Sequence, residues 1–245
     1  MNTDPTPLVD ILSHIKLIVI KSECFTSNDS YSAITLDGAN LKESRTSNIF
    51  LEQALITVTD LSKTKWIGLE TIELLCRYCN IANADWSGAR MMHTEFHNTR
   101  LTGCDFSSTT LRDVLFYHCK IDLSLFHDSH LTGCRFHGCD LRETDFQNAS
   151  LKRVVFRDCD LRNSRYPGAS LSEIDLRGSQ VAGMYADANE LQSAIVDPFQ
   201  VADIASMIGL VVNRLPADSP TEYTSRLRHE PAENHPSIQP EGETK

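Results

Sequence analysis

A large apolar side chain recurs at every fifth position of this chain, and this spacing constrains the fold more than any other feature. All 21 positions reached in steps of five from residue 81 to residue 181 are apolar. Because 41% of the residues are hydrophobic, chance gives such a run with a probability on the order of 10⁻⁸, so the repeat is real. The positions are Ile81, Trp86, Met91, Phe96, Leu101, Phe106, Leu111, Phe116, Ile121, Phe126, Leu131, Phe136, Leu141, Phe146, Leu151, Phe156, Leu161, Tyr166, Leu171, Leu176 and Val181.

A second column of mostly small residues lies two positions before each large one and includes Cys119, Cys139 and Cys159. A helix with 3.6 residues per turn would spread both columns around its circumference, and a strand would turn them over at every repeat. A chain that turns a corner every five residues keeps both columns inside. The pattern therefore predicts a solenoid, in which each unit buries its apolar side only by stacking on its neighbours.

Two features indicate four units per coil. Phe and Leu alternate along the large column, so the number of units is even, and the small-column cysteines recur every twenty residues. Such a coil stacks one set of aromatic residues on one side and a second set on the opposite side. The first set is Phe96, Phe116, Phe136 and Phe156, and the second is Phe106, Phe126, Phe146 and Tyr166.

Units such as GCDLR, ETDFQ, NASLK and NADWS resemble the A(D/N)LXX units of the pentapeptide-repeat family. The resemblance implies an all-β fold, a right-handed quadrilateral parallel β-helix. We expect residues 81–196 to form its regular part and residues 31–80 to form irregular N-terminal coils. Thr46, Thr71 and Cys76 break the pattern there, and we expect a loop near Lys42–Asn48.

The two ends of a solenoid expose strand edges and need covers. Residues 1–30 form an N-terminal segment in which Pro7–Ile20 predicts a short helix and Lys16–Lys21 a strand. Residues 197–213 predict a helix–strand cap, in which Asp197 is the N-cap, Gly209 ends the helix and Leu210–Val212 is a short strand. Residues 214–245 are rich in Pro, Glu and Ser, a composition typical of a disordered tail.

The C-terminal cap also resembles the end of several quinolone-resistance pentapeptide proteins, where a helix and strand form a homodimer interface. The resemblance implies a homodimer here, and a monomeric cap is the alternative. The residues expected to make this contact are Val201, Ile204, Ile208, Leu210 and Val212.

The polar residues reveal no catalytic or metal-binding constellation. Cys76-x-x-Cys79 is a lone pair of cysteines in inward positions, which favours packing over zinc binding. Stacked cysteines point alongside one another, so we expect free thiols. Six outward histidines are scattered over several faces without a metal-binding motif, and no cofactor is expected. They are His93, His97, His118, His127, His130 and His137.

The net charge of -10 and a pI near 5.3 argue against nucleic-acid binding through phosphates. No apolar run is long enough to span a membrane, and Pro7–Ile20 lacks the features of a signal peptide. The sequence therefore predicts a cytoplasmic protein that contacts neither membrane nor nucleic acid directly.

These observations favour a non-catalytic scaffold for a protein partner whose identity the sequence does not give. The alternative, from the resemblance, is a protein that binds DNA gyrase, a type II topoisomerase, and protects it from fluoroquinolones by DNA mimicry. Residues 81–181 hold 13 acidic and 12 basic residues, which argues against a mimic. An enzyme or metal protein is a third, weaker alternative.

Overall fold

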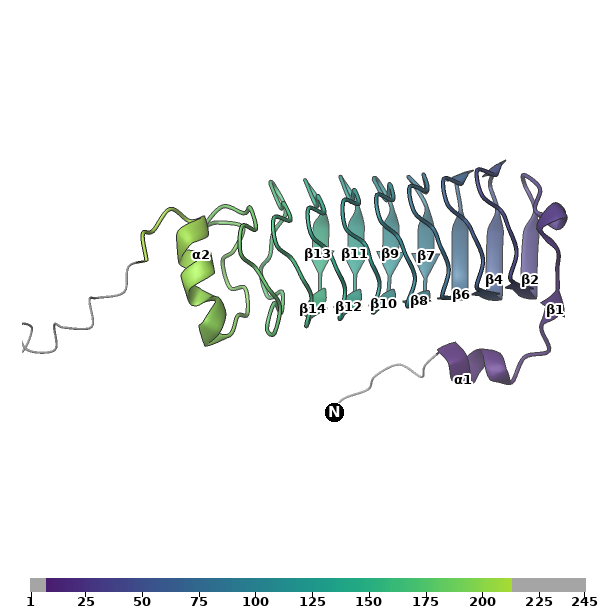
Figure 1. Ribbon diagram of the computed structural model, residues 1–245, viewed down its shortest axis with the longest axis horizontal. Coiled ribbons are helices and arrows are strands. Elements are labelled where there is room, and N and C mark those ends of the chain that lie inside the picture. The colour runs from purple at the N-terminus through teal and green to yellow at the C-terminus, as the bar shows by residue number, and fades with distance from the viewer. Residues whose placement is uncertain (1–7, 213–245) are drawn as a thin grey trace, which may run out of the picture. The chain divides into compact units, whose positions relative to one another are not determined.

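The structure is a computed structural model that describes residues 8–212. It is a right-handed, four-sided parallel β-helix with a short C-terminal α-helix, and it confirms the predicted fold class. Strands of successive coils lie side by side along the solenoid (Figure 1). All the strand pairs are parallel, and partners such as Phe116 and Phe136 are one coil of twenty residues apart.

The elements fall into three groups. The first group precedes the coils and comprises α1 (Leu8–Ser13), β1 (Ile18–Val19) and the 3₁₀ turn η1 (Ser22–Cys24). The coils contain β2 (Ser30–Asp37), β3 (Arg45–Ser47), β4 (Phe50–Thr57), β5 (Lys65–Ile67), β6 (Glu70–Arg77), β7 (Arg90–Met92), β8 (Glu95–His97), β9 (Thr110–Arg112), β10 (Leu115–Tyr117), β11 (His130–Thr132), β12 (Arg135–His137), β13 (Ser150–Lys152) and β14 (Val155–Arg157). The 3₁₀ turn η2 (Pro198–Gln200) and α2 (Val201–Met207) follow them.

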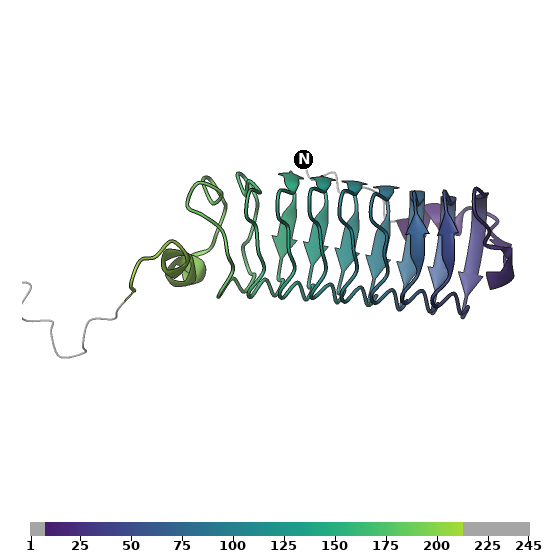
Figure 2. The same ribbon diagram turned by 90° about the horizontal axis from the view of Figure 1, so that it is seen from above.

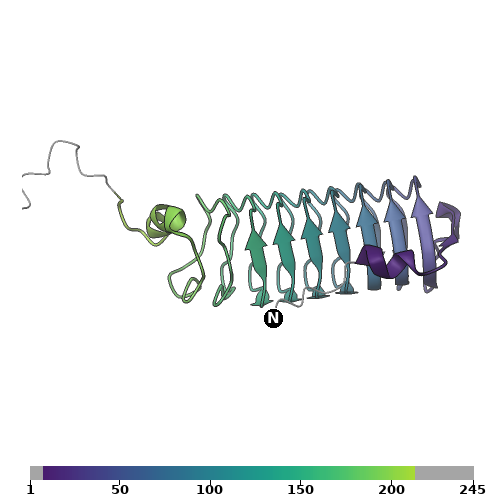
Figure 3. The same ribbon diagram turned by 90° about the horizontal axis from the view of Figure 1, so that it is seen from below.

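Two rows of short strands diverge from the long strand β6. This strand pairs with β7 through its first half and with β8 through its second half. One row continues as β7, β9, β11 and β13, and the other as β8, β10, β12 and β14 (Figures 2 and 3). Their outer surfaces are called the β7–β13 face and the β8–β14 face below.

The core consists of columns of stacked side chains. Phe136 lies with its ring centroid 4.7 Å from that of Phe116 and 5.0 Å from that of Phe156. On the opposite side, the Phe126 and Phe146 rings are 4.9 Å apart. All seven phenylalanines predicted for this core are fully buried; they are Phe96, Phe106, Phe116, Phe126, Phe136, Phe146 and Phe156.

The predicted cysteine column is a row of thiols. Cys119, Cys139 and Cys159 are buried and free of disulfides. The Sγ of Cys139 donates a hydrogen bond to the carbonyl oxygen of Phe116 at 3.3 Å, and Cys159 bonds to Phe136 in the same way at 3.4 Å. The thiols therefore occupy the small inward positions and satisfy carbonyl groups of the preceding coil.

Every corner of the coil places one residue in the left-handed backbone region, two positions after the large inward residue. Examples are Asn83 at φ 57°, Gly138 at φ 61° and Val58 at φ 50°. This column was not predicted from the sequence, although Gly, Asn and Asp hold many of its positions, and these residues tolerate positive φ best. A β-branched valine tolerates it poorly.

Replacing Val58 by asparagine is therefore expected to stabilise the protein. The side chain is 62% exposed, so little burial is lost, and relief of the left-handed valine is worth about 1 kcal/mol. Urea denaturation of Val58→Asn should show a higher midpoint than the parent. Val19→Asn is the matched control, because Val19 is exposed in a strand without positive φ. An equal rise in both variants would contradict this explanation.

The N-terminal coils keep the same register as the regular part, and the expected loop near Lys42–Asn48 is wrong. Arg45–Ser47 is β3, which pairs with β5 one coil later. The inward polar residue Thr71 is accommodated in place, because its buried hydroxyl bonds to that of Thr94 at 2.8 Å. The interruptions in the hydrophobic pattern therefore do not interrupt the coil, because the backbone groups pair with those of neighbouring coils whatever the side chain.

The C-terminal cap begins as predicted, with a reciprocal capping box between Asp197 and Gln200. Gln200 is buried, and its Nε2 donates to the carbonyl oxygens of Leu176 and Ser179 at 2.6 and 2.7 Å. The helix ends before Gly209, at φ 85°. The predicted strand at Leu210–Val212 is wrong: these residues pair with no strand of the described chain. The backbone N–H of Leu210 instead donates to the carbonyl oxygen of Ala205 at 2.9 Å, in the turn that ends α2.

Gln200→Ala is expected to destabilise the C-terminal coil by about 2 kcal/mol, because two buried carbonyl groups lose their donor and the capping box is lost. Thermal unfolding followed by circular dichroism measures the change. Gln147→Ala is the control, since Gln147 is exposed. A Gln200→Ala curve that coincides with the control would show that these bonds contribute no net stability.

Within residues 8–212, no helix has the length and apolar character needed to cross a membrane. The predicted disordered tail, residues 214–245, lies outside the described residues.

Candidate interaction surface

A row of histidine, tyrosine and arginine side chains runs along the β8–β14 face. Successive strands place them one coil apart, as Cα partners across the parallel ladder. The sequence positions the row there because each residue directly follows a large inward residue and therefore points outward. We call this row the aromatic stripe; it consists of Arg77, His97, Tyr117, His137 and Arg157.

Tyr117 forms the centre of the aromatic stripe. Its ring centroid lies 5.5 Å from that of His97 and 5.3 Å from that of His137, with the latter pair nearly parallel at 10°. His118 meets the edge of the same tyrosine at 4.3 Å. Tyr117 remains 36% exposed. The histidines that sequence analysis placed on several faces thus include three gathered here, and a preorganised aromatic surface results.

Glu95 anchors the N-terminal end of the aromatic stripe. One of its oxygens lies 2.7 Å from the Nε2 of His97, and the other accepts the backbone N–H of Leu8 at 3.0 Å. Only 13% of its side chain is exposed. Burial acts to raise the pKa of Glu95, but the hydrogen bonds from His97 and Leu8 outweigh it and hold the pKa below its ordinary value.

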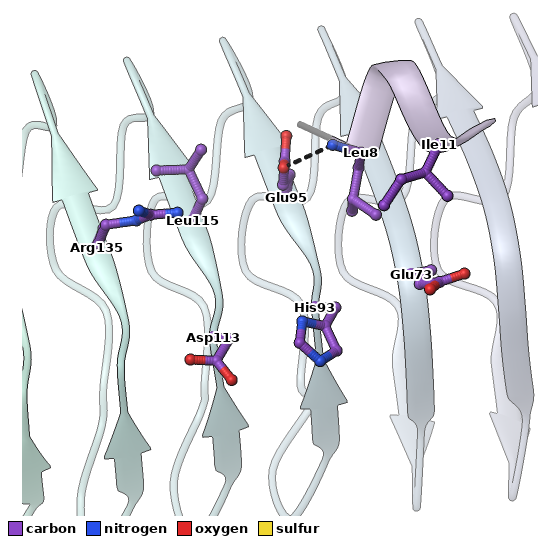
Figure 4. A pocket seen from close by; sticks show the side chains of 8 residues that line it. All are labelled: Leu8, Ile11, Glu73, His93, Glu95, Asp113, Leu115 and Arg135. Carbon is purple, nitrogen blue, oxygen red and sulfur yellow. Dashed lines mark hydrogen bonds between the residues drawn. The ribbon is translucent and has the colours of Figure 1, made fainter. Parts of the chain in front are cut away.

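The helix α1 covers the first part of the same face. Leu8 and Leu12 are buried against Leu75, with Leu55 packed beside them. Sequence analysis predicted a short helix here but not its docking site. Between α1 and the later strands lies a hollow of about 250 Å³ (Figure 4). It is lined by Leu8, Ile11, Glu73, His93, Glu95, Asp113, Leu115 and Arg135.

Acidification is expected to loosen α1. The pKa of Glu95 is lower in the folded state, so its contribution is present above the unfolded value of about 4.3 and is lost as the pH falls through the folded pKa. The protection of the α1 amides from hydrogen exchange, relative to the intrinsic rate at each pH, should be high at pH 7 and fall below about pH 4.

Glu95→Gln is the control for this pH dependence, because an amide keeps an acceptor for the Leu8 N–H and does not ionise in this range. Its α1 exchange, corrected for the intrinsic pH effect, should be independent of pH. A parent protein with the same flat profile would show that Glu95 does not couple α1 to pH.

The buried thiols of Cys76, Cys104 and Cys134 lack the properties of nucleophiles. Burial raises the pKa values of Cys104 and Cys134 to about 12, so both are protonated at neutral pH. The pKa of Cys76 is also raised, by its hydrogen bond with Cys79 and by burial. Residues 8–212 contain no group of three potential ligands that could hold a metal ion.

Carboxylates at the C-terminal coils are paired with arginines two residues further along. Asp140 and Arg142 approach to 2.7 Å, and Asp160 and Arg162 to 2.6 Å. The Nε of Arg142 also lies 3.6 Å from the Oδ2 of Asp160, one coil later. Acidic and basic side chains therefore lie next to one another on these coils, and the carboxylates do not form a continuous negatively charged column.

The expected dimer residues lie at the C-terminal end of the described chain, and most are exposed. Phe199, which the sequence analysis did not select, is 94% exposed, and Ile204 is half-buried against the core. This part of the chain thus presents several large apolar side chains to solvent. The exposed predicted residues are Val201 at 55%, Ile208 at 44%, Leu210 at 59% and Val212 at 52%.

Comparison with known proteins agrees with this geometry. A family model described as a pentapeptide repeat region matches residues 76–146 and, overlapping, 109–185. Residues 76–185 of this chain form a pentapeptide-repeat region. The matched region contains the regular coils and the aromatic stripe from Arg77 to Arg157. No curated protein matches the chain.

Solved structures of other pentapeptide-repeat proteins are similar to this chain. QnrB1, a plasmid-mediated fluoroquinolone resistance protein, is 16% identical with a TM-score of 0.37, and the match covers 74% of this chain and 99% of QnrB1. HetL from the cyanobacterium Nostoc sp. strain PCC 7120, involved in heterocyst differentiation regulation, is also 16% identical with a TM-score of 0.37. That match covers 70% of this chain and 94% of HetL.

Proposed function

We propose that this pentapeptide-repeat protein is a non-catalytic scaffold that binds a protein partner through the aromatic stripe. The observation that carries the proposal is the stack of His97, Tyr117 and His137 at the surface. Tyrosine supplies a large contact area at low entropic cost, and such residues dominate binding energy in protein interfaces. The stack is held by the rigid coil, so little order has to be gained on binding.

The surroundings of the aromatic stripe support the same function. Arginine ends the row on both sides, and Arg157 reaches Asp175 at 2.9 Å. Arginine and tyrosine around a partly apolar centre match the composition of interface cores. The interior behind the aromatic stripe is filled by fully buried phenylalanines. Such a core makes the coil a rigid support for a bound partner, and the proposal includes no catalytic role.

Site-specific photo-crosslinking tests the scaffold proposal. A photoreactive phenylalanine analogue replaces Tyr117 in one variant and the exposed Gln147, on the opposite side of the coil, in the other. In the native host, the first variant should give a discrete protein adduct that the second does not. Adducts of the same size and yield from both sites would refute binding at the stripe.

The contact expected at the C-terminal end is a second part of the proposal: two copies associate through Val201, Ile208 and Leu210. Their exposure supports it, because apolar surface of this kind favours burial in an interface. Analytical ultracentrifugation should find a dimer for the parent protein and a monomer for Ile208→Asp. A monomeric parent at high micromolar concentration would exclude the dimer.

A topoisomerase is the alternative partner, because the C-terminal cap resembles the end of quinolone-resistance pentapeptide proteins and exposes apolar side chains. The paired carboxylates of the late coils oppose DNA mimicry. A gyrase supercoiling assay with and without a fluoroquinolone decides between the two: inhibition or drug rescue supports gyrase, and no effect at a large excess of protein supports another partner.

We also place the protein in the cytoplasm, which its eight free cysteines support.

A further inference from the structure

A hollow with apolar walls lies on the β7–β13 face, away from the aromatic stripe. It has a volume of about 240 Å³ and spans the outer surface of β6, β7 and β9. Its apolar walls are Phe50, Ile72 and Met92, and Met92 is 36% exposed. A space of this size accommodates one large aliphatic side chain from another molecule.

Cations surround this hollow and continue beyond it. Arg90 and Arg112 contribute to its lining, and Arg90 is paired with Glu70 at 3.1 Å. The four strands β7, β9, β11 and β13 read RMM, TLR, HLT and SLK. They therefore contain three cations and no carboxylate, and Arg153 follows the last of them. The hollow itself contains one carboxylate, that of Glu70, and Asp113 lies at the corner after β9.

This arrangement contrasts with the protein as a whole, whose net charge is -10. A local row of cations in an acidic molecule attracts a negatively charged partner and orients it there. We propose that the hollow and the row of Arg112 and Lys152 bind an acidic segment of another protein that carries one large aliphatic side chain. The aliphatic group occupies the hollow, and its carboxylates pair with the two cations.

The spacing of the coils limits the segment. Neighbouring parallel strands lie about 4.8 Å apart, so Arg112 and Lys152, two coils apart in register, are separated by about 10 Å along the solenoid. A peptide in the polyproline II conformation rises about 3.1 Å per residue with three residues per turn, so side chains three residues apart point to one side and lie about 9 Å apart. Carboxylates three residues apart, following the aliphatic residue, therefore match the row.

A protein segment fits this face better than a nucleic acid does. A phosphate backbone has no aliphatic side chain to fill the walls formed by Phe50, Ile72 and Met92. The remaining acidic surface also repels a long polyanion, which a short peptide avoids.

Fluorescence anisotropy of the full-length protein tests the proposal with a defined probe. The probe is a fluorescein-labelled twelve-residue peptide in which one leucine is followed by glutamates three residues apart. Saturable binding that weakens at high ionic strength is expected. Replacing the leucine by serine, or the glutamates by lysine, should weaken binding by at least about tenfold.

The protein variants distinguish this site from general charge attraction. Arg112→Glu combined with Lys152→Glu should weaken binding by at least about tenfold, and Met92→Glu should do the same. Arg100→Glu combined with Lys120→Glu is the matched control: it changes the net charge equally on the opposite side of the coil and should leave affinity unchanged.

Absence of saturable binding at millimolar protein, or an equal loss in the control variant, would overturn the proposal. So would equal binding of a single-stranded oligonucleotide of the same charge, which would show a general polyanion site. Because the aromatic stripe lies on another face, Tyr117→Ala should not change peptide binding. The proposal can therefore fail independently of the scaffold function at Tyr117.

Discussion

Phe136→Ala should lower the free energy of unfolding by about 3–5 kcal/mol, the range for removing a fully buried phenylalanine from a well-packed core. The ring lies between two stacked neighbours at 4.7 and 5.0 Å and also meets the edges of Phe126 and Phe146. A coil held by backbone bonds above and below cannot collapse into the cavity, so most of the lost contact stays lost.

Urea denaturation followed by circular dichroism and tryptophan fluorescence measures this effect. Trp66 and Trp86 are buried and stacked 5.8 Å apart in earlier coils, so they report whether the loss spreads beyond the altered coil. Phe199→Ala is the matched control, because this phenylalanine is 94% exposed. Similar midpoints for the two variants would refute the stacked core as the main source of stability.

The second large effect concerns size in the small inward column. Cys139→Phe should destabilise by about 3 kcal/mol, and Cys139→Ala by about 1 kcal/mol, because the site is fully packed and a larger side chain must displace its neighbours. Cys139 is 2% exposed and lies between Cys119 and Cys159 in the column. The order of the two effects distinguishes crowding from simple loss of the thiol.

Thermal unfolding of both variants provides the measurement. Cys24→Phe is the control, since Cys24 is the exposed cysteine and its substitution should change little. If Cys139→Phe were as stable as Cys139→Ala, the small column would have room for a ring, and the requirement for small residues there would be wrong.

The core could be predicted because every coil repeats one local pattern. A large residue such as Phe136 and a small one such as Cys139 face inward wherever the five-residue period holds, and one coil predicts the next. The left-handed corners were also present in the sequence, as Gly, Asn or Asp two positions after many of the large residues. Val58 shows why this signal is weak: the backbone imposes the conformation even on a residue that disfavours it.

The proposed surfaces depended on more than the period. His97, Tyr117 and His137 occur twenty residues apart, but their ring contacts depend on the register and rotamers of three adjacent strands. The hollow beside Met92 was not predicted at all. It combines Phe50, Ile72 and Arg112 from different coils, and an individual repeat does not show which outward side chains leave a gap between them.

The sequence by itself thus determined the coil, its four sides and its stacked core, because a residue's inward or outward direction follows from its place in a repeating unit. Only the tertiary structure decided where the non-repeating ends return to the coil. Leu8 reaches Glu95 across 87 positions, Gln200 reaches back to Leu176, and Leu210–Val212 forms no strand. The physical reason is that these contacts join segments without a common period, so they depend on the path of the chain in space.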